Sequence, residues 1–240
     1  MAERPTSGAR DDPGRPRTLR LAHRGDWRAA PENSLAAILA ALTVAGCDGL
    51  EFDLRNSLDR VPVLLHDADL ARVQNVPVKC STLTAEELAA HGIPTFNEVL
   101  DAVECEVFLD VELKERVDAA IDLLELERGR VGDDGTPQLR SAVVSSFNHD
   151  ILRWLGAARP AWPRWLNAYD LSPSTVAAAS ELGCEVISAQ WHAIDEDAVA
   201  RARAAGIDVA AWTIRHAADY EGLEPLRLRA VCVEAAALAA

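Results

Sequence analysis

The sequence has few of the residues that would suggest thiolate, disulfide, nucleic-acid or membrane chemistry. Its five cysteines form no C-x-x-C pair, so their spacing predicts neither a zinc site nor a disulfide framework. Most are flanked by apolar residues, which favours buried free thiols in a reducing compartment. Lys and Arg number 24 against 38 Asp and Glu, for a net charge of −14. This balance argues against a surface that follows a nucleic-acid backbone or an anionic membrane.

Long hydrophobic runs are also missing, and no stretch approaches the length that would cross a membrane. Residues 1–17 are rich in Arg, Pro, Gly and Asp and lack the apolar core of a secretory signal. We therefore expect a disordered N-terminal tail, one domain over residues 18–240 and a cytoplasmic location. The sequence gives no indication of the oligomeric state.

From residue 19 onward, short β-type runs alternate with helical stretches. Omitting one extra run, the chain shows eight strand–helix steps, which is typical of a (β/α)₈ barrel. An open doubly wound sheet is the alternative, but the G-x-G-x-x-G turn expected there is absent. The predicted strands are 19–25, 49–55, 106–114, 141–147, 164–168, 186–190, 208–214 and 229–234. The predicted helices between them are 34–45, 116–130, 150–158, 175–182, 196–205 and 217–226.

One connection is longer than the others. The extra run at 61–65 follows a turn-like stretch and could form a hairpin with the second strand. Residues 67–95 are too few for a domain and are predicted to be an insertion after the second strand, irregular over 67–81. Short helices at 84–90 and 95–103 each begin with a Thr in a capping pattern. A polar loop is expected over 131–138.

Carboxylates stand at the ends of two predicted neighbouring strands, where a barrel places its active site. Successive strand residues alternate faces, so Glu51 and Asp53 point the same way, as do Asp110, Glu112 and Lys114. Carboxylates inside a barrel need a charged partner or a metal. Such an all-oxygen site suits Mg²⁺ or Ca²⁺ rather than zinc.

Two histidines end strand-like runs beside these carboxylates. His23 closes the first strand and His66 the extra run, and imidazole can donate or accept a proton near neutral pH. Arg24 and Lys114 add fixed positive charge. A divalent ion, two cations and two histidines together favour phosphodiester cleavage, in which one His deprotonates the nucleophile and the other protonates the leaving oxygen.

The motifs that carry these residues closely resemble those of the glycerophosphodiester phosphodiesterase family. They are His23-Arg24-Gly25, Pro31-Glu32-Asn33-Ser34, Glu51-Phe52-Asp53, His66-Asp67 and Val111-Glu112-Leu113-Lys114, with further matches at Ile93-Pro94-Thr95, Ser146-Phe147 and Ala211-Trp212-Thr213. The resemblance implies a (β/α)₈ barrel with a small insertion after the His-Asp motif. It also implies hydrolysis of a small anionic glycerophosphodiester to an alcohol and sn-glycerol 3-phosphate.

By position, the resemblance assigns roles to the individual side chains. Metal ligands would be Glu51, Asp53 and Glu112, and the acid–base pair His23 and His66. Residues for phosphate or substrate binding would be Arg24, Lys114, Trp212 and Glu32. Further candidates for substrate contact are Trp27, Ser146, Gln190 and Glu234. Family mechanisms often invoke attack by the neighbouring glycerol hydroxyl before water opens a cyclic phosphate.

Two departures from the family pattern bear on substrate choice. Glu234 stands where the family usually has Asp, and its extra methylene should shift the carboxylate. The insertion contains Val76-Pro77-Val78-Lys79 where the family tends to be Gly-rich.

The alternatives to a glycerophosphodiester phosphodiesterase are a related barrel phospholipase, of the phosphoinositide or sphingomyelin type, or a non-catalytic binder of a phosphate ligand. The insertion shows no exposed apolar run that would reach lipid, and a binder needs no acid–base pair.

Overall fold

Eight parallel strands form a closed barrel in this computed structural model, which describes residues 17–132 and 135–239. Around the barrel the strands are β1 Leu19–His23, β2 Gly49–Asn56, β6 Phe108–Leu113, β9 Ala142–Ser146, β10 Arg164–Ala168, β11 Val186–Gln190, β12 Asp208–Ile214 and β13 Ala230–Val233. Strand β1 pairs with both β2 and β13, which closes the sheet on itself. The predicted (β/α)₈ barrel is confirmed. The expected tail falls mainly on residues 1–16, which lie outside the described part of the chain.

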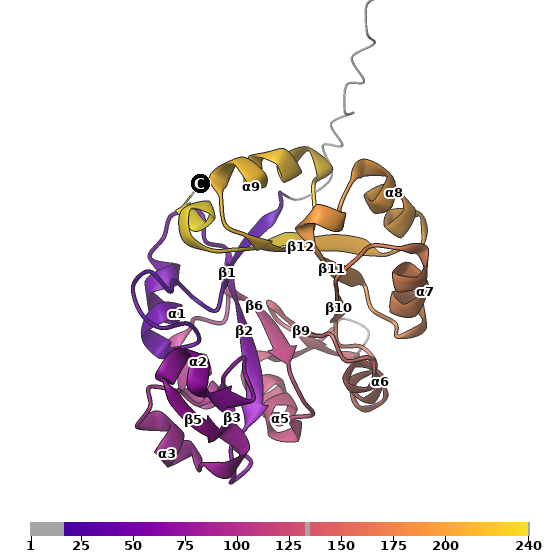
Figure 1. The fold of residues 1–240 in the computed structure, drawn as a ribbon. Helices are drawn as coiled ribbons and strands as arrows, with labels where there is room; N and C mark the ends of the chain where they lie inside the picture. The colour runs from indigo at the N-terminus through magenta and orange to yellow at the C-terminus, as the bar shows by residue number, and fades with distance from the viewer. Residues whose placement is uncertain (1–16, 133–134, 240) are drawn as a thin grey trace, which may run out of the picture.

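An outer ring of helices surrounds the barrel (Figure 1). Its members are α1 Leu35–Leu42, α4 Phe96–Ala102, α5 Asp118–Arg128, α6 His149–Ala158, α7 Pro173–Glu181, α8 Glu196–Ala204 and α9 Ala217–Leu223. Polar caps begin several of them: the Ser34 hydroxyl accepts a hydrogen bond from the Ala37 amide, and Thr95 forms a capping box with Glu98. These side chains satisfy amides that have no partner within the helix, so the sequence itself sets where the helices begin.

The alternation of strand residues separates two hydrophobic cores. Phe52, Val111 and Leu113 belong to the large core between strands and helices. Leu21 and Trp165 belong to a smaller core that, by the same alternation, fills the barrel interior. Because apolar side chains occupy that interior, the polar residues further along the same strands are confined to the carboxyl ends.

The insertion is more regular than the sequence indicates. Strand β3, Pro62–Leu64, pairs antiparallel with β2, as the predicted hairpin requires. The stretch 67–81 was expected to be irregular, and this is wrong. It contains β4 Asp69–Leu70, α2 Ala71–Gln74, the antiparallel partner strand β5 Val76–Lys79 and the 3₁₀ turn Cys80–Thr82, and α3 Ala85–Ala89 follows. These short elements share a small hydrophobic core of their own, which local propensity does not reveal.

The expected polar loop at 131–138 is also partly structured. Strands β7 Gly129–Val131 and β8 Pro137–Leu139 pair antiparallel and flank it, while residues 133–134 lie outside the described part. Short 3₁₀ turns occupy Trp191–Ala193, Glu224–Leu226 and Ala235–Ala239. None of these elements changes the order of the barrel strands.

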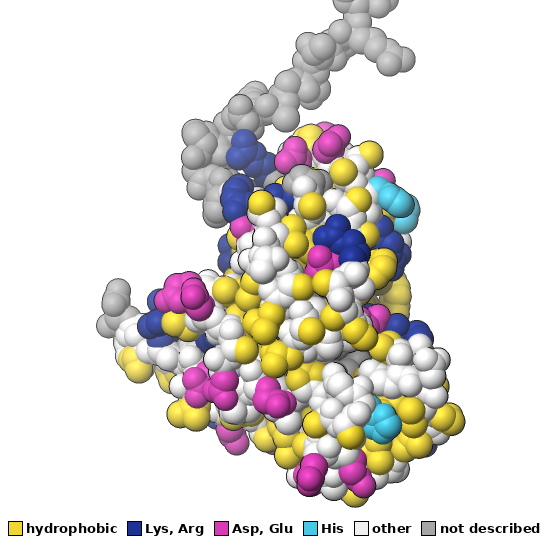
Figure 2. Space-filling view, turned by 90° about the vertical axis from the view of Figure 1, so that its left-hand side faces the viewer, with side chains coloured by type: hydrophobic (Ala, Val, Ile, Leu, Met, Phe, Trp, Pro, Cys, Tyr) yellow, Lys and Arg dark blue, Asp and Glu magenta, His cyan; other side chains and the backbone are white. Residues whose placement is uncertain are grey.

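On the face that carries α1 and the insertion, Lys and Arg side chains lie in small separate groups among acidic and apolar ones (Figure 2). Among the residues that the structure describes, the basic side chains on this face form no continuous surface of the kind that nucleic acid requires. Within residues 17–132 and 135–239, every helix is too short or too polar to cross a bilayer.

Candidate active site

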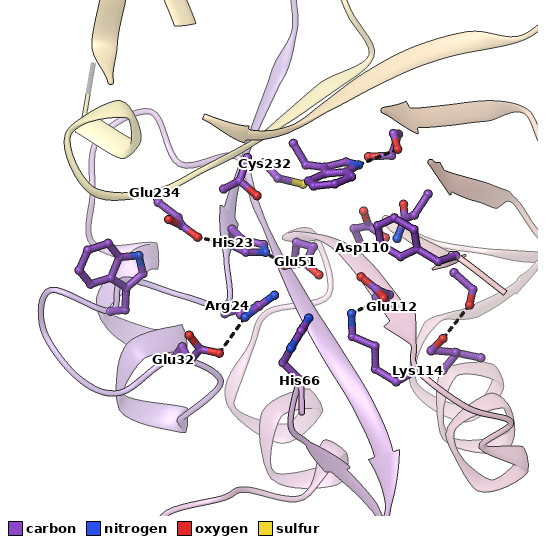
Figure 3. Close-up of a pocket in the computed structure, with 18 of the residues that line it drawn as sticks. His23, Arg24, Glu32, Glu51, His66, Asp110, Glu112, Lys114, Cys232 and Glu234 are labelled. Carbon is purple, nitrogen blue, oxygen red and sulfur yellow. Dashed lines mark hydrogen bonds and ion pairs between the residues drawn. The ribbon is translucent and has the colours of Figure 1, made fainter. Parts of the chain in front are cut away.

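A cavity of about 870 Å³ opens at the carboxyl ends of the barrel strands. Of the residues predicted from the sequence, those that line it are His23, Arg24, Trp27, Glu32, Glu51, His66, Glu112, Lys114, Ser146, Trp212 and Glu234. Asp53 is fully buried directly beside them. Gln190 is not among the lining residues, and its amide nitrogen lies 2.7 Å from His192 Nδ1. Figure 3 shows His23, Arg24 and His66 pointing into the same space as Glu51, Glu112 and Lys114.

A left-handed turn at the end of β1 places the first histidine and arginine. Arg24 and Gly25 have φ values of 61° and 83°. A Cβ on Gly25 would lie 2.5 Å from the backbone carbon of Ala37, so the turn can pack on α1 only without a side chain there. The backbone therefore turns sharply after His23 and directs Arg24 across the mouth of the barrel.

Strand register brings the carboxylates together. Glu51 lies opposite Asp110 and Asp53 opposite Glu112 in the β2–β6 pair. One oxygen each from Glu51, Asp53 and Glu112 can be chosen so that all lie within 4.8 Å of one another, and all three residues are buried. Burial and repulsion from Asp53 and Glu112 raise the pKa of Glu51 well above its usual value. Burial likewise raises the pKa of Glu112 and of Asp110 to about 7.

Two cations offset part of this negative charge. Lys114 Nζ lies 2.9 Å from Asp53 Oδ1 and also pairs with Glu112, while Arg24 Nε lies 3.0 Å from Asp53 Oδ2. Burial disfavours the Asp53 carboxylate, but Arg24 and Lys114 outweigh it and lower the pKa of that group. Asn33 donates a hydrogen bond of 2.8 Å to Asp53 Oδ2. Asp53 is therefore the carboxylate of the cluster whose charge is best compensated, and Glu51 the one whose ionised form is most disfavoured.

His23 is held by a carboxylate from the far end of the chain. Its Nδ1 is hydrogen-bonded to Glu234, whose other oxygen accepts from Arg215 Nε at 2.8 Å. This partner fixes Nδ1 as the protonated nitrogen and leaves Nε2, 3.7 Å from Glu51 Oε2, facing the carboxylate cluster. Burial lowers the pKa of His23 despite the bond to Glu234. Glu234, for which the sequence predicted a possible substrate contact, thus contacts a histidine of the site.

His66 has a matching arrangement on the insertion side. Its Nδ1 lies 2.7 Å from Asp67 Oδ1, and Arg55 Nη2 donates to its backbone carbonyl at 2.8 Å. Burial lowers the pKa of His66. Each histidine therefore has a carboxylate beside Nδ1.

Aromatic side chains form another part of the cavity wall. The rings of Phe147, Tyr169 and Trp212 lie with centroids 5.2–5.6 Å apart. Trp212 Nε1 donates to the Ser188 carbonyl at 2.8 Å, which fixes the indole. The Ser146 hydroxyl donates to the Leu113 carbonyl at 2.7 Å. Its polar hydrogen is thus directed into the protein backbone.

Comparison with known proteins assigns this arrangement to a family. The model of the glycerophosphoryl diester phosphodiesterase family matches residues 23–237, which begin at His23 and include Glu234. The chain belongs to that family.

Individual members of the family match over different lengths. A glycerophosphodiester phosphodiesterase of Caldanaerobacter subterraneus is 30% identical over 151 residues, which cover 57% of this chain and 61% of that protein. A probable glycerophosphodiester phosphodiesterase 1 of Mycobacterium tuberculosis is 26% identical over 85% of this chain and 83% of its own. The matched segment of the Bos taurus phosphodiesterase 1 spans 22% of that protein.

Solved structures of family members share the fold. An Oleispira antarctica phosphodiesterase, solved in complex with the product sn-glycerol-3-phosphate, superposes with a TM-score of 0.77 at 25% identity, covering 90% of this chain and 93% of the other. The Thermotoga maritima glycerophosphodiester phosphodiesterase gives a TM-score of 0.75 at 24% identity, with 92% and 96% covered. The barrel described above is therefore the barrel of this family.

Several residues that line the cavity or contact its lining were not predicted as functional. Asn33, Asp67 and Asp110 stand inside motifs or strands that the sequence singles out, so their position was available but their contacts were not. Arg72 and Arg215 lie outside every motif quoted above. Arg72 binds Asp67 and Glu32, and Arg215 binds Glu234. These pairs become visible only once the fold is known.

Proposed function

We propose that the protein hydrolyses glycerophosphodiesters to an alcohol and sn-glycerol 3-phosphate, with His23 and His66 as the acid–base pair. One observation carries this proposal: two histidines, each with Nδ1 on a carboxylate, face one cluster of three buried carboxylates. A binding protein would need the charges but not two oriented imidazoles. The product held by the Oleispira relative supports the same substrate class.

A divalent cation fits the cluster of Glu51, Asp53 and Glu112. Within the described residues, Glu51 Oε2 is buried without a hydrogen-bond partner. The elevated pKa of Glu51, which results from burial and like charge, also indicates a missing positive charge. The donors are all carboxylate oxygens, which favour Mg²⁺ or Ca²⁺. When bound, such an ion would stabilise negative charge on the phosphoryl oxygens.

Proton transfer falls to the two Nε2 atoms. One imidazole accepts the proton of the attacking hydroxyl, the phosphorus–oxygen bond to the alcohol breaks, and the other imidazole protonates the departing alkoxide. The attacking group is either the neighbouring glycerol hydroxyl, in which case water then opens the cyclic phosphate, or water itself. Both routes balance to the same products. Both also use the same histidines, with their roles exchanged in the second step of the cyclic route.

Substrate binding is divided between charge and aromatic surface. Arg24 and Lys114 lie beside the carboxylate cluster and can contact the phosphate once the cluster is neutralised. Trp212, at the aromatic wall, would contact the glycerol or alcohol part, and the exposed Trp27 at the mouth offers another apolar face. Glu32 binds Arg24 at 2.8 Å and so supports the phosphate contact indirectly.

A coupled assay tests this proposal. Purified protein is incubated with glycerophosphocholine or glycerophosphoethanolamine, with Mg²⁺, Ca²⁺ or EDTA, and release of sn-glycerol 3-phosphate is followed through its dehydrogenase. We expect turnover that needs the metal and is lost in His23→Ala and His66→Ala. His91→Ala, which removes an exposed histidine away from the cavity, serves as the matched control and should be unchanged.

The outcomes distinguish the alternatives. Binding of glycerol phosphate without turnover of any diester would favour the non-catalytic binder and refute the proposal. Turnover only of micellar lysophospholipid or phospholipid would favour the barrel phospholipase.

A further inference from the structure

We propose that Arg72, on helix α2 of the insertion, is a positioning residue that holds His66 and Arg24 by bridging Asp67 and Glu32. The inference rests on the proposed phosphodiester hydrolysis and assigns a role in it to the insertion. Arg72 lies in the cavity wall and is not one of the residues expected from the motifs.

The guanidinium of Arg72 contacts two carboxylates from separate segments. Nη1 and Nη2 donate to the two oxygens of Glu32, at 2.9 and 2.6 Å, in a bidentate pair. Nε donates to Asp67 Oδ2 at 2.6 Å. Glu32 belongs to the connection between β1 and α1, and Asp67 follows β3, so one side chain joins the first βα loop to the start of the insertion.

Each carboxylate has a second contact that leads into the site. The other oxygen of Asp67 lies 2.7 Å from His66 Nδ1. Glu32 Oε1, which accepts from Arg72, also accepts from Arg24 Nη1 at 2.8 Å. Arg72 is thus one residue removed from a proposed acid–base group on one side and from a proposed phosphate contact on the other. Figure 3 shows Arg24, Glu32 and His66 along the same edge of the cavity.

The geometry, rather than the strength of one ion pair, supports this role. The Arg72 side chain is 49% exposed, and exposed ion pairs contribute little to stability. A planar guanidinium, however, fixes the orientation of the carboxylates it binds at three nitrogens. Helix α2 has only four residues and is followed by Asn75 in the left-handed conformation, so its own backbone restrains the position of Arg72 weakly.

The consequence for the reaction divides into two parts. Losing the contact to Asp67 frees that carboxylate to rotate away from Nδ1. His66 then loses its fixed tautomer and its fixed ring orientation, and kcat falls. Losing the contact to Glu32 frees the side chain that orients Arg24, so the phosphate is held less tightly and KM rises. One substitution should therefore change both constants, while substitution of either carboxylate changes mainly one.

Kinetics of Arg72→Gln, Asp67→Asn and Glu32→Gln in the coupled assay test this division. We expect Arg72→Gln to lower kcat roughly 10- to 100-fold, the range of a lost charged hydrogen bond, and to raise KM. Asp67→Asn should reproduce the fall in kcat and Glu32→Gln the rise in KM. Arg153→Ala, which removes a similarly exposed arginine and its ion pair on α6, is the matched control and should change neither.

Combined variants decide whether Arg72 acts through its partners. Adding Arg72→Gln to Asp67→Asn should lower kcat no further, because the bridge is already broken. Multiplicative losses would overturn the proposal. So would a raised KM with unchanged kcat in Arg72→Gln, which would make Arg72 a direct substrate contact. Arg72→Lys should rescue at most one constant, since one ammonium cannot make three directed bonds; full rescue of both would also overturn it.

An assay without substrate separates this inference from the function on which it rests. Amide hydrogen exchange over residues 67–79 should be faster in Arg72→Gln than in the wild type and unchanged in Arg153→Ala. Equal exchange in Arg72→Gln and wild type would refute the bridge. If the wild type hydrolyses no diester, the proposed function fails on that result, while the exchange experiment still decides whether Arg72 holds this segment.

Discussion

Replacing Glu234 with Gln removes the charge that orients His23 while nearly preserving the side-chain volume. Glu234 is 8% exposed and contacts both His23 Nδ1 and Arg215 Nε. A hydrogen bond between charged partners contributes about 1.5–3 kcal/mol. Because about 1.4 kcal/mol corresponds to a tenfold change in rate, we expect kcat to fall roughly 10- to 100-fold.

The pH dependence of Glu234→Gln should also change in a defined direction. Burial lowers the pKa of His23 and the bond to Glu234 raises it, so loss of the carboxylate lowers that pKa further. The limb of the kcat/KM profile that reports His23 should therefore move to lower pH, whichever proton-transfer step His23 performs. Glu234→Asp should be intermediate, because a side chain one carbon–carbon bond shorter, about 1.5 Å, reaches Nδ1 poorly.

The measurement is kcat and kcat/KM against pH in the coupled assay, with Glu185→Gln as a control that neutralises an exposed carboxylate outside the cavity. Unchanged kcat together with an unchanged profile in Glu234→Gln would refute the argument that Glu234 positions His23. An unchanged kcat in Glu234→Asp alone would show that the family's shorter residue also reaches the imidazole here.

Three further predictions concern stability. Gly25→Ala should destabilise the fold more than Gly92→Ala in chemical unfolding. Both glycines have positive φ, but a Cβ at Gly25 would lie 2.5 Å from the α1 backbone, whereas a Cβ at Gly92 would have nothing within 4 Å. Equal losses of unfolding free energy in the two variants would contradict this. In thermal melts, Mg²⁺ or Ca²⁺ at about 100 times Kd should increase the free energy of unfolding by about 2.7 kcal/mol. Glu51→Gln should abolish that increase and should stabilise the metal-free protein, because it relieves repulsion within the carboxylate cluster; an increase with metal that persists in the variant would contradict the proposed metal site. Burial favours neutral Glu234, but His23 and Arg215 outweigh burial and lower its pKa from 4.5 to about 2. The Glu234 carboxylate therefore stabilises the fold above pH 4.5, and this contribution is lost as the pH falls toward 2. In acid unfolding experiments, the stability of Glu234→Gln should show no such loss between pH 4.5 and 2.

Much of the fold was predictable because the signals are local. The period-two alternation in Glu51-Phe52-Asp53 and in Asp110–Lys114 sets which residues face the barrel interior. Capping residues such as Thr95 mark helix starts. The insertion was harder to predict, since β4, α2 and β5 are two to four residues long and depend on one another and on a shared core. Elements of that size have no periodicity to detect.

The identity of most cavity residues was predictable for the same reason, whereas their partners were not. Motifs place His23 at the end of the first strand and Glu51 and Glu112 within the next two, and the parallel register brings these positions together. Glu234 was expected to be displaced from the family's position and to be a candidate for substrate contact. Its bond to His23, 211 positions away in the chain, required the closure of β13 onto β1.

The sequence alone therefore determined the barrel, the strands that carry the cavity's polar residues and the excess of inward-facing carboxylates, because alternation and capping act over a few residues. Only the tertiary structure decided how those charges are balanced. Arg72 and Arg215 each bind the carboxylate that holds a histidine, and the insertion that carries Arg72 meets the first βα loop only in the folded chain. The physical reason is range: an ion pair depends on the distance between side chains in space, and that distance is set by strand register and barrel closure.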